Sequence, residues 1–141
     1  MPTRNASATW EGGLRGGKGS FKGETGLGGN YSFGSRFEQA QGSNPEELLA
    51  AAEAACFSMA LALGLEQNGT PPTRVETQAA CTIDKQGDGF AITTMKLVTR
   101  AEVPGIDDAT FQKIAAATKD GCPVSKVLKG NVDLQLDAKL V

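Results

Sequence analysis

The stretch from Leu48 to Leu65 is apolar at nearly every position and is rich in alanine. Just before it, Asn44-Pro-Glu-Glu47 is typical of a helix start, with Asn as the N-cap, Pro at the first helical position and two acids in the first turn. The sequence therefore predicts a helix over about residues 45 to 67. Because a chain of 141 residues cannot easily surround a helix that is apolar on all sides, we expect a second copy of the chain to cover part of it.

Strand patterns precede this helix. Residues 1–43 hold 11 of the 18 glycines, and the short alternating runs between them predict strands joined by tight turns. One strand is expected from Ala6 to Trp10. Another is expected through Tyr31, Phe33 and Phe37, with Arg36 on the opposite face.

Residues 74–141 predict two further strands, two helices and a last strand. A strand over Val75 to Ile83 and a turn at residues 86–89 lead to a returning strand with Ala91, Met95, Leu97, Ala101 and Val103 toward the core. Helices follow from Asp107 or Asp108 to Gly121 and from Pro123 to Gly130, and a strand over residues 132–137 ends the series. This order predicts a single α+β domain over residues 1–141, with antiparallel sheets packed against helices.

The charge distribution argues against a nucleic-acid partner. Lys and Arg total 14 against 16 Asp and Glu, so the net charge is −2, and the two signs are interspersed. The N-terminus lacks the apolar core of a signal peptide, and Glu53 interrupts the long apolar stretch. We therefore expect a cytoplasmic protein without a membrane span.

The chain contains three cysteines and no histidine. A Cys-His dyad, a Ser-His-Asp triad and imidazole metal ligands are therefore excluded. Cys56, Cys81 and Cys122 form no C-x-x-C pair, so we expect neither a metal site nor another cofactor. An odd number of cysteines without a secretion signal favours thiol chemistry over a structural disulfide framework.

The three cysteines differ in their surroundings. Cys81 lies on the apolar face of its strand and is expected to pack in the core. Cys122 lies between Gly121 and Pro123, either as the N-cap of a helix whose dipole favours a thiolate or as filling for a helix junction. Cys56 lies about three turns into the long helix, and its position alone predicts a core residue.

Charged neighbours bear on Cys56. Glu46 lies about 80° from the direction of Cys56 around the helix, whereas Glu47 points to the opposite side. Both acids could instead serve the helix N-terminus. Arg36 is close enough in sequence to pair with Glu46, or it could be an exposed strand cation. Glu53 is a further neighbour, and its charge would oppose a Cys56 thiolate.

Several segments resemble the OsmC/Ohr family of hydroperoxide reductases. They are Arg36-Phe-Glu38, Gly42-Ser-Asn-Pro-Glu-Glu-Leu-Leu49, Ala54-Ala-Cys-Phe-Ser-Met-Ala60, Gly89-Phe-Ala-Ile92, Val103-Pro-Gly-Ile106 and Gly121-Cys-Pro-Val-Ser125. The Arg in Arg-Phe-Glu, with Trp10-Glu-Gly and Gly17-Lys-Gly19, resembles the osmotically inducible OsmC branch more than the Ohr branch. The resemblance implies an OsmC-like α+β fold with a long buried central helix, in an intertwined homodimer whose active sites lie at the subunit interface.

The resemblance also implies roles for four residues of a cytoplasmic thiol peroxidase in oxidative and osmotic stress defence. Cys56 would be the peroxidatic thiol and Cys122 the resolving thiol, which reverses the ranking that helix dipoles alone favour. Arg36 would activate Cys56, and Glu46 would orient Arg36.

The apolar surroundings of Cys56 favour organic hydroperoxides over H₂O₂ as substrates. An external dithiol, in the family often a lipoylated protein, would reset the enzyme. Neither Cys81 nor Glu53 belongs to a motif of the family, so neither is assigned a role. The alternatives are a non-enzymatic stress-induced binding protein and a protein thiol-disulfide exchange protein on the same fold.

Overall fold

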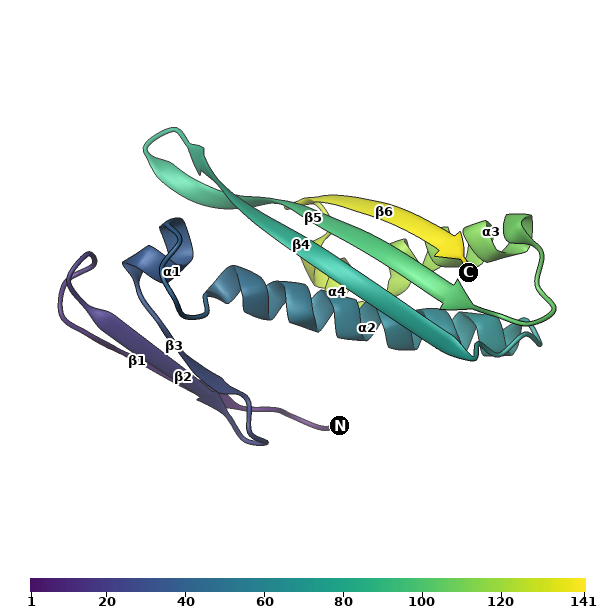
Figure 1. Cartoon of the computed structure of the whole chain (residues 1–141), viewed down its shortest axis with the longest axis horizontal. Helices are drawn as coiled ribbons and strands as arrows, with labels where there is room; N and C mark the ends of the chain where they lie inside the picture. The colour runs from purple at the N-terminus through teal and green to yellow at the C-terminus, as the bar shows by residue number, and fades with distance from the viewer. The chain divides into compact units, whose positions relative to one another are not determined.

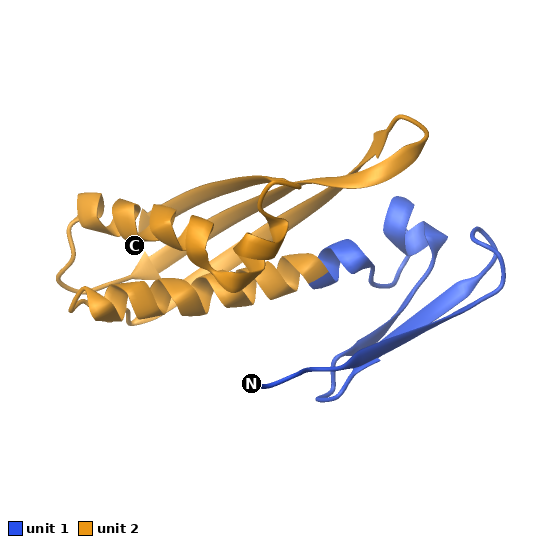
Figure 2. Cartoon of the chain, turned by 180° about the vertical axis from the view of Figure 1, so that it is seen from behind, with its two compact units in different colours: residues 1–48 blue, residues 49–141 orange.

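The computed structural model describes residues 1–141, and the chain forms two compact units. Unit 1 comprises Met1–Leu48 and unit 2 comprises Leu49–Val141 (Figure 2). The boundary falls in the first turns of helix α2, Pro45–Gln67, so this helix belongs to both units. Each unit has its own three-stranded sheet.

The sheet of unit 1 is antiparallel and has the order β1-β2-β3. Its strands are β1 (Ala6–Glu11), β2 (Lys18–Gly23) and β3 (Gly28–Tyr31). The Trp10 and Tyr31 rings lie 5.4 Å apart between centroids, and a Cβ on Gly19 would collide with both. The strand predicted from Ala6 to Trp10 is present, and of the strand expected through Tyr31, Phe33 and Phe37 only the part at Tyr31 is present, as the end of β3. Gly19 has no side chain, which allows the two aromatic rings to approach the backbone.

The expected strand through Phe33 and Phe37 is wrong. After Tyr31 the chain forms a short helix, α1 (Phe33–Phe37), capped by reciprocal hydrogen bonds between Ser32 and Ser35. This capping box satisfies the first backbone N–H groups of the helix, which outweighs the β-propensity of the aromatic residues. The guanidinium carbon of Arg36 lies 5.3 Å from the centroid of the Phe37 ring, so these side chains are not on opposite faces.

Helix α2 begins and ends as predicted. The Asn44 side chain accepts a 2.8 Å hydrogen bond from the backbone N–H of Glu47. Unit 2 buries one stripe of the helix, repeating every four residues: Glu53, Phe57, Leu61 and Leu65. Other apolar side chains of α2 are uncovered in the single chain, among them Met59 at 73% exposure and Leu63 at 53%.

By length and composition alone, α2 would also suffice to cross a membrane. Core helices of globular proteins pass the same test, and the buried stripe of α2 packs in the core of unit 2.

The sheet of unit 2 has the order β4-β5-β6 (Figure 1). Strands β4 (Arg74–Gln86) and β5 (Gly89–Glu102) are antiparallel, as expected, but β6 (Asp133–Leu140) pairs parallel to β5. The sheet is therefore mixed rather than purely antiparallel. The reason is the connection through α3 (Asp108–Gly121) and α4 (Pro123–Leu128), which returns the chain to the starting end of β5. The helices of unit 2 lie on one face of this sheet (Figure 2).

A register shift corrects one expected core position in β5. Thr82 pairs with Thr94, but Ile83 pairs with Ile92, so Thr93 is an extra residue in β5. Ala91 therefore faces the same side as its partner Asp84, and Ile92 takes the side on which Ala91 was expected. The other predicted core residues of this strand are buried: Met95, Leu97, Ala101 and, just after it, Val103.

The burial of Phe111 on α3 gives a stability prediction. Phe111 is fully buried, whereas Phe90 in β5 is 59% exposed. We expect Phe111→Ala to lower the free energy of unfolding by about 3 to 5 kcal/mol, because it removes packed surface and leaves a cavity. Phe90→Ala should cost less than about 1 kcal/mol. Urea unfolding of both variants at one protein concentration measures this, and equal losses would contradict the described core.

Candidate active site

Cys122 lies at the junction of two helices. It is the C-cap of α3 and the N-cap of α4, and only 2% of its surface is exposed. Its backbone N–H donates to the carbonyl of Thr118, and its own carbonyl accepts from the N–H of Lys126. The Cys122 side chain makes no capping hydrogen bond to α4. Cys122 is thus both an N-cap by position and part of a helix junction, the two alternatives that the sequence left open. Its thiol, however, is buried in the protein interior.

A buried hydrogen-bond network surrounds the Cys122 thiol. Its sulfur lies 2.9 Å from Ser125 Oγ and 3.5 Å from Glu53 Oε1. Ser125 Oγ donates to the same Glu53 oxygen at 2.6 Å. Glu53 is fully buried, and its Oε2 has no hydrogen-bond partner. The sequence analysis predicted neither the contact of Glu53 with Cys122 nor the hydrogen bonds that Ser125 makes with both residues.

A sequence signal for Ser125 did exist. Residues at the N-cap and three positions later bring their side chains together at the start of a helix, and Cys122 and Ser125 have this spacing. No comparable local signal places Glu53 beside them, since it comes from a helix distant in sequence.

Burial raises the pKa of the Cys122 thiol above its ordinary value. The contact with Ser125 acts in the opposite direction, while the neighbouring Cys56 thiol and the charge of Glu53 raise the pKa further. Cys122 therefore remains a thiol at neutral pH, although it caps a helix. Desolvation outweighs the dipole that favours Cys122 as the reactive thiolate.

Cys56 and Cys122 are brought together. The Cys56 thiol on α2 is a neighbour that raises the pKa of the Cys122 thiol, and Cys56 lines the same groove as Pro123, the residue after Cys122. Both cysteines are free rather than joined in a disulfide. Cys56 is half-buried, in contrast to Cys122. Two reduced thiols from separate helices, one accessible and one enclosed, can form a disulfide when the accessible one is oxidised.

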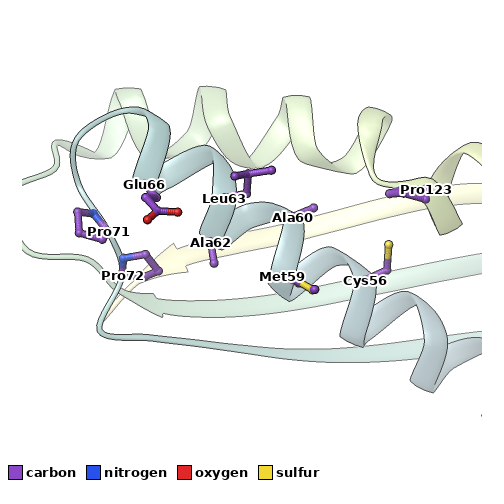
Figure 3. Close-up of a pocket in the computed structure, with 9 residues that line it drawn as sticks. All are labelled: Cys56, Met59, Ala60, Ala62, Leu63, Glu66, Pro71, Pro72 and Pro123. Atoms are coloured by element: carbon purple, nitrogen blue, oxygen red, sulfur yellow. The ribbon is translucent and has the colours of Figure 1, made fainter. Parts of the chain in front are cut away.

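Cys56 also lines an open groove of about 770 Å³. Figure 3 shows Cys56 beside Pro123 near one end of the lining and the pair Pro71 and Pro72 near the other. The remaining lining residues are apolar except for one acid: Met59, Ala60, Ala62, Leu63 and Glu66. A groove of this composition suits an apolar ligand whose reactive end meets the thiol.

Arg36 and Glu46 form an ion pair within unit 1. Arg36 donates from Nε at 3.1 Å and from Nη2 at 2.9 Å to the same oxygen, Oε1 of Glu46. Glu46 is 5% exposed, and its Oε2 is buried without a hydrogen-bond partner, whereas about a third of the Arg36 side chain is exposed. The carboxylate thus fixes one edge of the guanidinium and leaves the rest accessible.

The segment between the two residues of this pair is fixed by polar contacts. The Asn44 side chain donates to the carbonyl of Ser35 at 3.0 Å, and Ser35 Oγ donates to the carbonyl of Ser43 at 2.7 Å. These bonds tie α1 to the start of α2. The Arg36–Glu46 contact that the sequence permitted is therefore present, on a helix rather than a strand.

Arg36 also lines a small pocket of unit 1. The pocket has a volume of about 230 Å³ and is otherwise formed mainly by aromatic and apolar side chains: Trp10, Leu14, Tyr31, Ser32, Phe33 and Phe37. An accessible cation at the edge of an apolar pocket can bind a polar group attached to an apolar body.

The remaining candidates lie apart from these contacts. Cys81 on β4 is paired with Met95 and packs against the core of unit 2, as expected. Glu47 is exposed and accepts a hydrogen bond from Ser43 Oγ. No cluster of acidic or cysteine side chains in the structure could hold a metal ion.

Comparisons with known proteins agree with the fold and the motifs. Residues 38–137 match the family model described as "OsmC-like protein". The chain is 46% identical to "Peroxiredoxin OsmC" of Escherichia coli over 138 residues, 96% of each chain. It is 36% identical to "Organic hydroperoxide resistance protein OhrB" of Bacillus subtilis over 99 residues, 70% of this chain and 71% of the relative.

Among solved structures, the chain is similar to an organic hydroperoxide resistance protein from Elizabethkingia anophelis, determined with thiocyanate bound. The TM-score is 0.78 and the identity 25%, covering 100% of this chain and 98% of that one. The predicted α+β fold and the greater similarity to OsmC than to Ohr are confirmed. This chain belongs to the OsmC-like family.

Proposed function

We propose that this protein is a cysteine-based peroxidase that reduces organic hydroperoxides, and H₂O₂ more weakly, in defence against oxidative and osmotic stress. The general class rests on the relatives, one named as a peroxiredoxin and one as an organic hydroperoxide resistance protein. Membership of the same family with 46% identity carries the thiol-peroxidase activity to this chain.

One observation carries the mechanism: Cys56 is a neighbour of Cys122 that raises its pKa, and no disulfide joins the two cysteines. Of the two, Cys56 lines the groove and can meet a substrate. Cys122 is enclosed, and burial raises its pKa. This difference supports Cys56 as the attacking thiol and Cys122 as the resolving thiol.

The reaction then has two steps. The Cys56 thiolate attacks the terminal oxygen of the hydroperoxide, the O–O bond breaks, and an alcohol leaves after taking up a proton. Cys56 becomes a sulfenic acid. The Cys122 sulfur next attacks the Cys56 sulfur, and water leaves as the disulfide forms. A dithiol reductant must restore both thiols, and we propose a lipoylated protein in this role.

Arg36 and Glu46 supply the charge that histidine provides in other thiol enzymes. We propose that Arg36 stabilises the Cys56 thiolate and hydrogen-bonds the peroxide, while Glu46 holds its guanidinium in place. The two hydrogen bonds to Glu46 Oε1 support the second part of this role.

We also propose that the protein is a cytoplasmic, intertwined homodimer with active sites at the interface. The uncovered apolar surface of α2 supports a partner subunit, because monomeric proteins rarely expose such a surface. Met59 and Leu63 lie on this surface and also line the groove next to Cys56.

Replacement of Cys56 tests the reaction itself. Cys56→Ser should lower the rate of cumene hydroperoxide reduction, measured with a dithiol reductant, by about 1000-fold or more, because no thiolate attacks the peroxide. Cys81→Ser is the matched control and should keep the wild-type rate. Full activity in Cys56→Ser would exclude the mechanism. No peroxide turnover by the wild type would favour a binding or thiol-exchange protein.

Replacement of Arg36 tests thiolate activation. Arg36→Met should slow oxidation of Cys56 in stopped-flow single turnovers by about 10²- to 10³-fold, since a charged hydrogen-bond donor to the transition state is lost. Arg74→Met removes an arginine from an exposed ion pair with Glu76 and should change the rate less than about twofold. Equal rates for both variants would remove Arg36 from the mechanism.

Replacement of Met59 tests the subunit interface. Met59→Glu should shift the sedimentation coefficient from that of a dimer to that of a monomer, because a charge would be buried in the apolar interface. Val127→Glu changes a side chain of α4 that is also exposed in the single chain, and it should leave the dimer intact. A monomeric wild type would contradict the proposed assembly.

A further inference from the structure

Glu53 is an ionisable side chain beside the reacting thiols that the mechanism above does not use. It is fully buried on the same stripe of α2 as Phe57, Leu61 and Leu65. No lysine or arginine forms an ion pair with it, and its Oε2 has no hydrogen-bond partner. Burying such a group costs free energy, so packing alone would favour an apolar side chain at this position. A buried, incompletely satisfied carboxyl group in contact with a reactive centre indicates a chemical task.

The hydrogen bonds around Glu53 define a direction for proton movement. The Ser125 hydroxyl has a single hydrogen, and Ser125 donates it to Glu53 Oε1 at 2.6 Å. In the 2.9 Å contact between Ser125 and Cys122, the thiol is therefore the donor. The thiol also lies within 3.5 Å of Glu53 Oε1 directly. Both routes lead the Cys122 proton to the same carboxyl oxygen.

We propose that Glu53 is the general base of the resolving step and takes the Cys122 proton, directly or through Ser125, as Cys122 attacks the Cys56 sulfenic acid. The inference rests on the proposed peroxidase function. An S–S bond forms between the two cysteines while the S–O bond of Cys56 breaks. The leaving hydroxide becomes water with the proton that Glu53 has received. Cys122 is oxidised and Cys56 is reduced from the sulfenic state, so no further oxidant is needed.

A general base is needed because burial of Cys122 disfavours its thiolate, the form that attacks Cys56. Burial and the charge of Glu53 raise the pKa of Cys122, so few molecules carry a Cys122 thiolate in the resting state. When the proton moves to Glu53, the carboxyl group becomes neutral and no longer repels the developing thiolate. The same residue thus adds to the burial that keeps Cys122 protonated before Cys56 is oxidised, and it accepts the proton afterwards.

The Glu53→Gln variant isolates proton acceptance. Glutamine has nearly the same shape and can still accept the Ser125 hydrogen bond, but it cannot serve as this base. The reduced protein is mixed with one equivalent of cumene hydroperoxide and quenched at intervals with dimedone, which traps sulfenic acid. Mass spectrometry of the intact chain then gives the amounts of Cys56 sulfenic acid and disulfide over time. Glu47→Gln, an exposed change on the same helix, is the matched control.

We expect Glu53→Gln to form the sulfenic acid at the wild-type rate and the disulfide about 100-fold or more slowly, the usual contribution of a general base. Its sulfenic acid should therefore accumulate, as it does in Cys122→Ser, while Glu47→Gln behaves as wild type. Disulfide formation at the wild-type rate, or slower formation of the sulfenic acid, would overturn the assignment. If Glu53→Gln does not fold, Glu53→Met takes its place, because an apolar side chain suits this buried position, with slower disulfide formation as the supporting result and an unchanged rate as the contrary one.

A pH series distinguishes a base from a residue that only supports the structure. The titratable groups acting on Cys122 are Cys56 and Glu53, both on α2. In Glu53→Gln the Cys122 proton must leave to solvent, so the disulfide-forming rate should rise about tenfold per pH unit between about pH 7 and 9. The wild-type rate should change much less, and parallel profiles would contradict the role. A wild type that forms no sulfenic acid at all would instead show that the peroxidase function is wrong.

Discussion

The packing of one stripe of α2 into unit 2 is the constraint on which the site depends. Phe57, Leu61 and Leu65 fix the rotation of the helix, and at the same four-residue interval Glu53 enters the core. Once this rotation is set, Cys56 lies at the edge of the buried stripe, where its thiol is a neighbour of Cys122 and also lines the groove. A change of rotation by one residue would bury the wrong side chain and separate the two thiols.

The sequence predicts well those parts of the fold that depend on local signals. The Asn44 cap and the apolar run locate α2. Gly121 marks the end of α3, and Pro123 marks the start of α4. Non-local features are harder to predict. The parallel pairing of β6 depends on where two helices return the chain, and the bulge at Thr93 depends on the partner strand.

In the candidate site too, contacts between residues close in sequence could be predicted, and contacts between distant residues could not. Arg36 and Glu46 are close in sequence, so their pairing could be inferred, although the aromatic residues around Arg36 suggested a strand where the Ser32–Ser35 capping box forms a helix. The family motifs, rather than the residues alone, imply that Cys56 is the reactive thiol. The buried contact of Glu53 could not be inferred, because a single glutamate in an apolar helix gives no indication of which distant side chain it meets.

The absence of histidine has a counterpart in the charges that the proposed mechanism assigns to the two thiols. A thiolate that attacks needs a neighbouring cation, whereas a thiol that must wait for its partner to be oxidised needs a neighbouring proton acceptor. In the proposed mechanism Arg36 and Glu53 divide these tasks, which a single imidazole combines in other thiol enzymes. The division suits a two-cysteine reaction, because a cation shared by both thiols would favour both thiolates at once. Burial of Cys122 beside an anion instead makes its ionisation depend on the formation of the new sulfur–sulfur bond.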